Sequence, residues 1–363
     1  MAEPSAAGRV GISRGARFLI YGAAFVIVVS GARAAEAILV PFFLATMLAI
    51  ICATPLTWME RRGVPTLVAV TIIVIGLLAI GTSTGTLIGT SLIEFTSSLP
   101  AYQARLQREM TGLVAWLTAH GMEVSSQLLT DAFDPGQLLR VAARIFTGVG
   151  DVLSKIALIL IITVFILLEV AGFSSKIRAA STDPDRQFAR LARITENVRH
   201  YLALKTAISL ATGVLVAVWL RILGVDYALL WGLLAFLLNY IPSIGSIIAA
   251  IPAVLLAFLQ MGAGTSLVAA LGYLLINTVI GNFIEPRVMG QGVGLSTLVV
   301  FLSLVFWGWV LGPVGMLLSV PLTMILKIIL EEDEGTRWIS VLLGPRPSET
   351  SAADAPVVAA DPG

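Results

Sequence analysis

The chain has 363 residues, of which 57% are hydrophobic and 12% are charged, and its mean hydropathy is +0.94. Soluble domains carry about 25% charged residues, so this composition excludes a soluble protein and predicts an all-α, polytopic integral membrane protein. The net charge of +1 argues against a nucleic-acid partner, and the single cysteine, Cys52, excludes an intrachain disulfide.

Three membrane-spanning helices are predicted over residues 18–93, where they would form a scaffold after a cytoplasmic N-terminus at residues 1–17. We expect the first two to form a helical hairpin with a short turn at residues 33–36. The N-terminus, the loop at residues 60–63 and the segment 171–205 are all basic. If successive helices cross the membrane in alternate directions, these three segments lie on the same side. The positive-inside rule identifies that side as the cytoplasm.

Beyond the scaffold, the chain alternates between polar and apolar segments. Residues 94–151 are predicted to be a small extracytoplasmic insertion of two amphipathic helices, followed by a fourth transmembrane helix at residues 152–170. Residues 171–205 are predicted to be a cytoplasmic basic amphipathic helix. Residues 206–332 form the expected transport region, and residues 333–363 a cytoplasmic, largely disordered tail.

The transport region contains two apolar segments, 227–261 and 295–330, that are interrupted by proline and glycine. The first break reads Asn-Tyr-Ile-Pro-Ser-Ile-Gly from Asn239, and the second reads Gly-Pro-Val-Gly from Gly312. Backbone that is not helical is tolerated at membrane depth only where protein buries it or where it lines a polar cavity. We expect two re-entrant hairpins beside six full crossings, arranged as an inverted pair. The alternative is that the arms cross completely, which gives eight to ten transmembrane helices.

The two breaks and the polar helix between them hold the candidate solute or ion pathway. Glu285 is the main candidate because ionisable groups within membrane spans are costly, and Asn277 and Asn282 precede it at helical spacing. Alternatively, Glu285 only pairs with Arg287 at the membrane interface. The remaining pathway candidates are the polar and helix-breaking residues of the breaks: Asn239, Tyr240, Pro242, Ser243, Gly245, Gly312, Pro313 and Gly315.

A glycine repeat in the third predicted helix is a candidate packing surface. Gly81, Gly85 and Gly89 follow one another every four residues, which creates a groove that another helix can approach closely. The partner is either another helix of the same subunit or a neighbouring subunit.

Several classes of chemistry have no counterpart in the sequence. The chain lacks a Gly-x-x-x-x-Gly-Lys-[Ser/Thr] phosphate-binding loop, a Gly-x-Ser-x-Gly nucleophile motif and a His-Glu-x-x-His metal motif. Its two histidines, His120 and His200, lie far apart in the sequence. We therefore expect no enzymatic activity, no cofactor and no metal site.

These motifs together resemble the AI-2E family of transporters, named for export of the signal autoinducer-2. The resemblance covers roughly residues 18–332 and rests on the two breaks, on Asn282…Glu285-Pro286, and on Pro41-Phe42-Phe43-Leu44-Ala45 with Pro55 and Glu60-Arg61-Arg62-Gly63. It implies a bacterial inner-membrane permease without an ATP-binding subunit. It also implies homo-oligomers, pentamers among them.

Three functions are compatible with this sequence. The first is a secondary transporter that exports a small polar solute such as autoinducer-2 by alternating access. The second is a sodium (or other cation)/proton antiporter in which Glu285 titrates. The third is a membrane scaffold that acts through residues 94–151 without transport.

Overall fold

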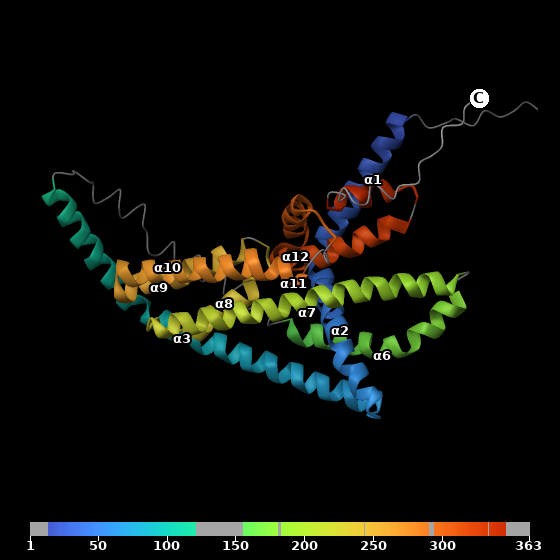
Figure 1. Cartoon of the computed structure of the whole chain (residues 1–363), viewed down its shortest axis with the longest axis horizontal. Helices are drawn as coiled ribbons and strands as arrows, with labels where there is room; N and C mark the ends of the chain where they lie inside the picture. Colours follow the sequence, from blue (N-terminus) through green and yellow to red (C-terminus); the bar gives the residue numbers. More distant parts are fainter. Residues whose placement is uncertain are drawn as a thin grey trace, which may run out of the picture.

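The computed structural model describes residues 14–120, 155–180, 183–242, 244–289, 294–332 and 334–345, and this part of the chain is helical without any strand (Figure 1). Its helices are α1 (Arg14–Ala34), α2 (Glu36–Arg61), α3 (Thr66–Ala119), α6 (Ile156–Ala180), α7 (Pro184–Ile222), α8 (Ala228–Leu238), α9 (Gly245–Met261), α10 (Ala263–Asn277), the π-helix η1 (Thr278–Ile284), α11 (Glu285–Met289), α12 (Thr297–Glu332) and α13 (Arg337–Leu343).

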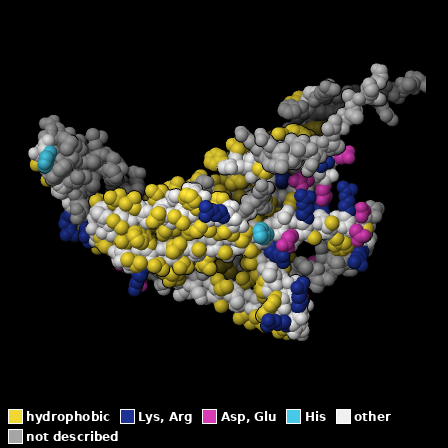
Figure 2. All heavy atoms as spheres, in the orientation of Figure 1, with side chains coloured by type: hydrophobic (Ala, Val, Ile, Leu, Met, Phe, Trp, Pro, Cys, Tyr) yellow, Lys and Arg dark blue, Asp and Glu magenta, His cyan; other side chains and the backbone are white. Residues whose placement is uncertain are grey.

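Much of the surface is apolar, as a lipid-facing protein requires (Figure 2). Among the described residues, five helical segments are long and apolar enough to cross a membrane. They are Glu36–Arg61, Thr66–Phe95, Pro184–Ile222, Ala263–Met289 and Thr297–Glu332, and shorter apolar helices lie at Leu19–Ala34, Ile156–Glu169, Ala228–Leu238 and Gly245–Met261. The predicted class, an all-α polytopic membrane protein, is confirmed.

The expected hairpin between the first two helices does not form. Only Ala35 separates α1 from α2, and its amide still bonds the carbonyl of Gly31 while its own carbonyl accepts from Leu39. One residue with φ −92° and ψ 11° bends a helix but cannot reverse it. The two helices therefore meet end to end and diverge, as Figure 1 shows in blue. The prediction of a turn at residues 33–36 was wrong because the small residues there continue the helical hydrogen bonding.

Two long helices run through boundaries at which the sequence suggested a change of environment. Helix α3 continues past Phe95, the end of its membrane-length segment, to Ala119. Helix α7 begins where expected, with the Asp183 carboxylate accepting from the Arg186 amide, and continues without a break to Ile222. Its 39 residues correspond to about 58 Å. The second amphipathic helix expected after residue 134 lies outside the described residues.

Two ends of the molecule can be distinguished along these helices. We call the end at which α7 begins, with Arg186, Arg190 and Arg193, the basic end. We call the end towards which α3 continues past Phe95 the insertion end. Both helices run from the basic end to the insertion end, from right to left in Figure 1.

Helices α8 and α9 form what we call the first hairpin. It enters and leaves at the insertion end, where the Asp226 amide donates to the Gln260 side chain at 3.0 Å. Close packing holds α8 against α7, because a Cβ at Gly213 would lie only 2.7 Å from the Gly232 carbonyl oxygen. A cluster of buried side chains that includes Trp231 and Leu256 fills the space around the hairpin.

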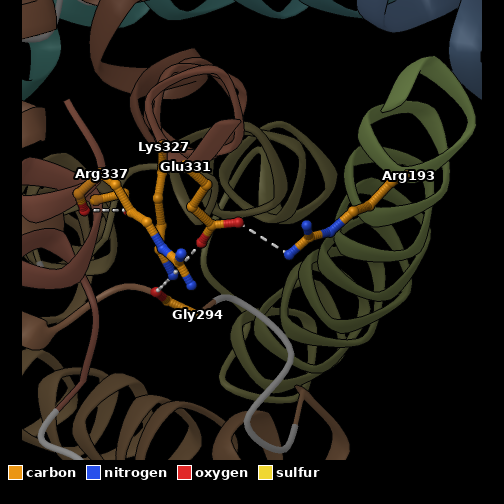
Figure 3. Close-up of polar contacts among 6 residues, drawn as sticks. Arg193, Gly294, Lys327, Glu331 and Arg337 are labelled. Atoms are coloured by element: carbon orange, nitrogen blue, oxygen red, sulfur yellow. Dashed lines mark hydrogen bonds and ion pairs between the residues drawn. The ribbon is translucent and has the colours of Figure 1, made fainter. Parts of the chain in front are cut away.

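Helix α12 is folded at its middle into what we call the second hairpin, with arms at residues 297–310 and 313–332. The backbone leaves the helical region at Leu311 (φ −121°, ψ 15°) and Gly312 (φ 64°, ψ −154°). At the open end of this hairpin, Lys327 of the second arm donates to the carbonyl of Gly294, which precedes the first arm, at 2.6 Å. Glu331 connects this end to α7, since it lies 2.9 Å from Arg193 and 3.5 Å from Lys327 (Figure 3). The second hairpin therefore opens towards the basic end.

Candidate functional site

A polar stripe follows one face of α7 through its otherwise apolar part. Tyr201, Lys205 and Ser209 are spaced by four residues and are all buried. Residues four apart share a face of an α-helix, so the stripe is directed at the helices that cover α7. It is the surface on which the predicted pathway residues assemble.

The strongest interaction on this stripe is an ion pair between Lys205 and Glu285. The Lys205 Nζ atom lies 2.5 Å from Glu285 Oε1, and the exposed fractions of the two side chains are 4% and 23%. Tyr201, one turn earlier on α7, lies within electrostatic range of Glu285. Buried charges need such a partner, because an uncompensated charge away from water costs several kcal/mol. The alternative in which Glu285 pairs with Arg287 is wrong.

A π-helix sets the direction of Glu285. Residues Thr278–Ile284 form η1, and the Glu285 amide donates to the Ile280 carbonyl across five residues. The Asn277 side chain lies over Gly281, where a Cβ would be 3.5 Å from its Oδ1. Asn282 is exposed, whereas Glu285 is partly buried. The wider turn breaks the predicted four-residue face, and single π-turns in α-helices are frequent at functional sites.

The first break packs its polar side chains against the same face of α7. Asn239 is buried and its Nδ2 donates to Ser209 Oγ at 3.0 Å, while Ser246 Oγ donates to Asn239 Oδ1 at 3.4 Å. The Tyr240 hydroxyl lies 2.6 Å from Thr206 Oγ1. Helix α7 thus brings Glu285 together with Asn239 and Tyr240, the predicted pathway residues of the first break.

The end of the first break requires a glycine. A Cβ at Gly245 would overlap the carbonyl oxygen of Leu238, so the second arm of the hairpin starts directly against the last turn of the first arm. Pro242 is half-buried at this turn, and Ser243 lies outside the described residues. The connection is therefore tight at Gly245, where the two arms meet, while Ile244 is exposed.

The second break lies in a different environment. Gly312 lies beside α2, since a Cβ there would be 2.9 Å from Glu36 Oε1, and the Pro313 side chain is exposed. A Cβ at Gly315 would overlap the Trp307 carbonyl oxygen. The structure therefore gives Gly315 the same packing role as Gly245, but it does not bring the second break into the cluster around Lys205.

The predicted glycine groove on α3 is open in the subunit. Among the described residues, no heavy atom lies within 4 Å of a Cβ built at Gly85 or Gly89, and Gly81 meets only the Ile156 side chain at 3.5 Å. Of the two partners considered for this groove, a helix of the same subunit does not fill it at Gly85 and Gly89 within the part of the chain that the structure describes.

Lys205, Thr206 and Ser209 are site residues that sequence reasoning missed. The sequence places Lys205 at the end of the cytoplasmic basic segment, where it groups with the arginines. Two features of the sequence could have identified Lys205. Tyr201, Lys205 and Ser209 are spaced by four residues, and an apolar run follows in which a lysine would lack water.

The site combines one cation, one anion and a row of uncharged hydroxyl and amide groups. These groups bind polar solutes by hydrogen bonding, and the ion pair can open to offer a carboxylate or an ammonium group. In the part of the chain that the structure describes, no group of three or more histidine, cysteine or acidic side chains could hold a metal ion.

Comparison with known proteins shows the family to which the chain belongs. Residues 18–334 match the family described as "AI-2E family transporter". The chain is 43% identical over 329 residues to "AI-2 transport protein TqsA" of Escherichia coli (strain K12), covering 91% of this chain and 96% of that protein. It is 40% identical over 331 residues to "Putative transport protein YhhT" of the same strain, covering 91% and 95%. A further relative, "Putative transport protein MT0215" of Mycobacterium tuberculosis, is 26% identical over 326 residues, covering 84% and 85%.

The match extends over the helices that build the polar stripe, both hairpins and the π-helix. Two relatives above 30% identity are covered almost to their full length. This multi-pass membrane protein therefore belongs to the AI-2E transporter family.

Proposed function

We propose that the protein is a secondary transporter of the bacterial inner membrane that exports a small polar solute, such as autoinducer-2, by alternating access. The observation that carries the proposal is the ion pair between buried Lys205 and partly buried Glu285, beside the first break. Ionisable residues inside membrane proteins mark substrate and ion pathways because burial makes them expensive to keep. The name of the relative TqsA suggests autoinducer-2 as the first solute to test.

The polar row beside the pair supports a solute site rather than a purely structural contact. Thr206, Ser209, Asn239, Tyr240 and Ser246 bond one another in pairs. A solute with hydroxyl groups can exchange these partners for its own, so that no buried polar group is left unpaired. In the outward-facing and the inward-facing state, a different one of the two hairpins would then move away from α7.

Solute efflux from proteoliposomes tests the function. We expect wild-type protein to release autoinducer-2, and Asn239→Ala to slow release at least about tenfold, which corresponds to about 1.4 kcal/mol. Asn282→Ala is the matched control, because the same residue type is exposed there. Equal loss in both variants, or full activity in Asn239→Ala, would refute a solute site at the first break.

We further propose that both hairpins are re-entrant, with their open ends on opposite membrane faces and both chain termini in the cytoplasm. Cysteines introduced at Gln260 and at the exposed Trp338, in a Cys52→Ser background, test this arrangement. A membrane-impermeant thiol reagent should label Gln260→Cys from the outside only and Trp338→Cys from the cytoplasm only. Labelling of both from one face would rule the inverted arrangement out.

The open groove on α3 supports a homo-oligomer, and the family resemblance suggests a pentamer. Small residues permit close helix contacts in membranes, where packing replaces the hydrophobic driving force. We expect Gly85→Leu to reduce the mass of the detergent-solubilised complex, measured by light scattering. Gly76→Leu is the control, since it lies on the same helix outside the repeat and also has open space around its Cβ.

A cation/proton antiporter is the second candidate function, and the contact between Glu285 and Lys205 is the observation that favours it. A sodium ion that reaches the carboxylate has to displace the Lys205 ammonium, which could then release a proton. Sodium-driven proton flux in solute-free vesicles, lost in Glu285→Gln, would favour this function over solute export. Absence of both fluxes from intact protein would leave the scaffold hypothesis for residues 94–151.

A further inference from the structure

The charges around the polar stripe cancel within a single contact. Lys205 and Glu285 lie on α7 and α11, 80 residues apart in sequence, and approach to 2.5 Å. The nearest side chains in sequence that can carry a charge near neutral pH, His200 and Arg287, are exposed. The remaining side chains of the stripe and of the first break that touch one another are hydroxyls and amides. The site therefore carries one positive and one negative charge and no net charge.

A buried site without net charge discriminates between solutes by their charge. An ionic solute would bring a charge into a low-dielectric space in which the existing cation and anion already compensate each other. An uncharged solute with hydroxyl groups can be held by the neutral row and by the ammonium and carboxylate together, since both form strong hydrogen bonds.

We propose that the site selects uncharged, hydroxylated solutes and rejects their phosphorylated forms because it has no net charge, and that Lys205 keeps it so by compensating the charge of Glu285. This inference rests on the proposed transport function and names its substrate class. Lys205 acts here as a charge-compensating residue for Glu285, so the effect of changing either one depends on the other.

The test measures release of autoinducer-2 and of its monophosphate from proteoliposomes with four proteins. Wild type should prefer the uncharged solute by about tenfold or more, as expected when one buried charge is left unpaired. Glu285→Gln leaves the ammonium alone, and should lose most autoinducer-2 transport and reduce or reverse the preference. Lys205→Gln leaves the carboxylate alone, and should reject the monophosphate at least as strongly as wild type does while moving autoinducer-2 more slowly.

The double variant Lys205→Gln/Glu285→Gln separates charge compensation from a structural role. Both glutamines are uncharged, so the preference for the uncharged solute should return even if the overall rate is lower than in wild type. The exposed pair Lys176–Glu169 supplies the matched control, because glutamines at both positions should leave rate and preference unchanged. If the single variants do not fold, the double variant still refutes the inference when it prefers the monophosphate or loses all preference.

The outcomes for the inference and for the transport function differ. Equal transport of the two solutes by wild type would overturn the inference and leave the transport function standing. A double variant that prefers the monophosphate, or that loses all preference, would also overturn it. Transport of neither solute by wild type would refute export of autoinducer-2 itself, and the inference would fall with it.

Discussion

The two hairpins have tips that are packed in the same way, but different contacts hold their open ends. In each, the glycine that ends the break lies against a carbonyl oxygen of the first arm: Gly245 against Leu238, and Gly315 against Trp307. The first hairpin opens towards the insertion end and the second towards the basic end. The repeated element is thus the tight tip, and the difference lies in the contacts that close the open ends.

Hydrogen bonds hold the open end of the first hairpin to α3, and we call this contact the insertion-end clasp. Tyr102 donates to the Asp226 carboxylate at 3.2 Å, and Gln260 donates to both the Tyr102 hydroxyl and the carboxylate. Burial raises the pKa of Tyr102 to about 12, so its hydroxyl stays protonated and can donate throughout the physiological range.

Charged groups hold the open end of the second hairpin to α7, and we call this contact the basic-end clasp. It consists of the bonds that Figure 3 shows among Arg193, Gly294, Lys327 and Glu331. Arg190 adds an ion pair with Glu332 at 3.2 Å. The two clasps lie on different hairpins at opposite ends of α7, so each can open without breaking the other. This is the property that alternating access needs.

Among the changes that test this comparison, substitutions at the tips should lower stability and transport the most. Gly245→Ala and Gly315→Ala each place a methyl group into a carbonyl oxygen, and overpacking of this kind costs about 1–3 kcal/mol or more. We expect both variants to unfold at lower temperature in detergent and to lose transport. Gly76→Ala, with open space around its Cβ, should be close to wild type. Stability unchanged at one tip only would show that the two tips are not equivalent.

Opening the basic-end clasp should have an intermediate effect that is confined to one hairpin. Glu331→Gln removes the charge that both Arg193 and Lys327 approach, and partly exposed ion pairs contribute about 0.2–1 kcal/mol each. Hydrogen exchange should become faster in α12 and remain unchanged in α8 and α9. The change should shrink at high salt because mobile ions screen these charges. Faster exchange in all three helices would mean that the hairpins do not move separately.

Opening the insertion-end clasp should have an effect of similar size, but in the opposite hairpin. Gln260→Ala removes bonds to Tyr102 and Asp226 that are accessible to solvent, and net hydrogen-bond contributions are about 0.5–1.5 kcal/mol. Exchange should become faster in α8 and α9 but not in α12. Combined with Glu331→Gln, the two effects should add, because the sites share no partner. A clear departure from additivity would indicate coupling between the hairpins.

Much of this architecture could be predicted from residue patterns, and the failures have physical causes. The breaks at Asn239 and Gly312 are visible because proline and glycine interrupt apolar runs that are otherwise uninterrupted. The turn expected at residues 33–36 failed because Gly31, Ala34 and Ala35 can all continue a helix. The predicted face through Asn277 and Glu285 failed because local sequence does not reveal where a π-turn shifts the register.

The sequence by itself determined the membrane class, the two interrupted segments and the presence of a carboxylate between them, because hydropathy and helix-breaking residues are local properties. Only the tertiary structure decided that Lys205 belongs to the site, that it pairs with Glu285, and that the second break lies near Glu36 instead of beside the first. These are contacts between distant segments. They depend on which helix faces meet, and that is settled by close packing at positions such as Gly213 and Gly232.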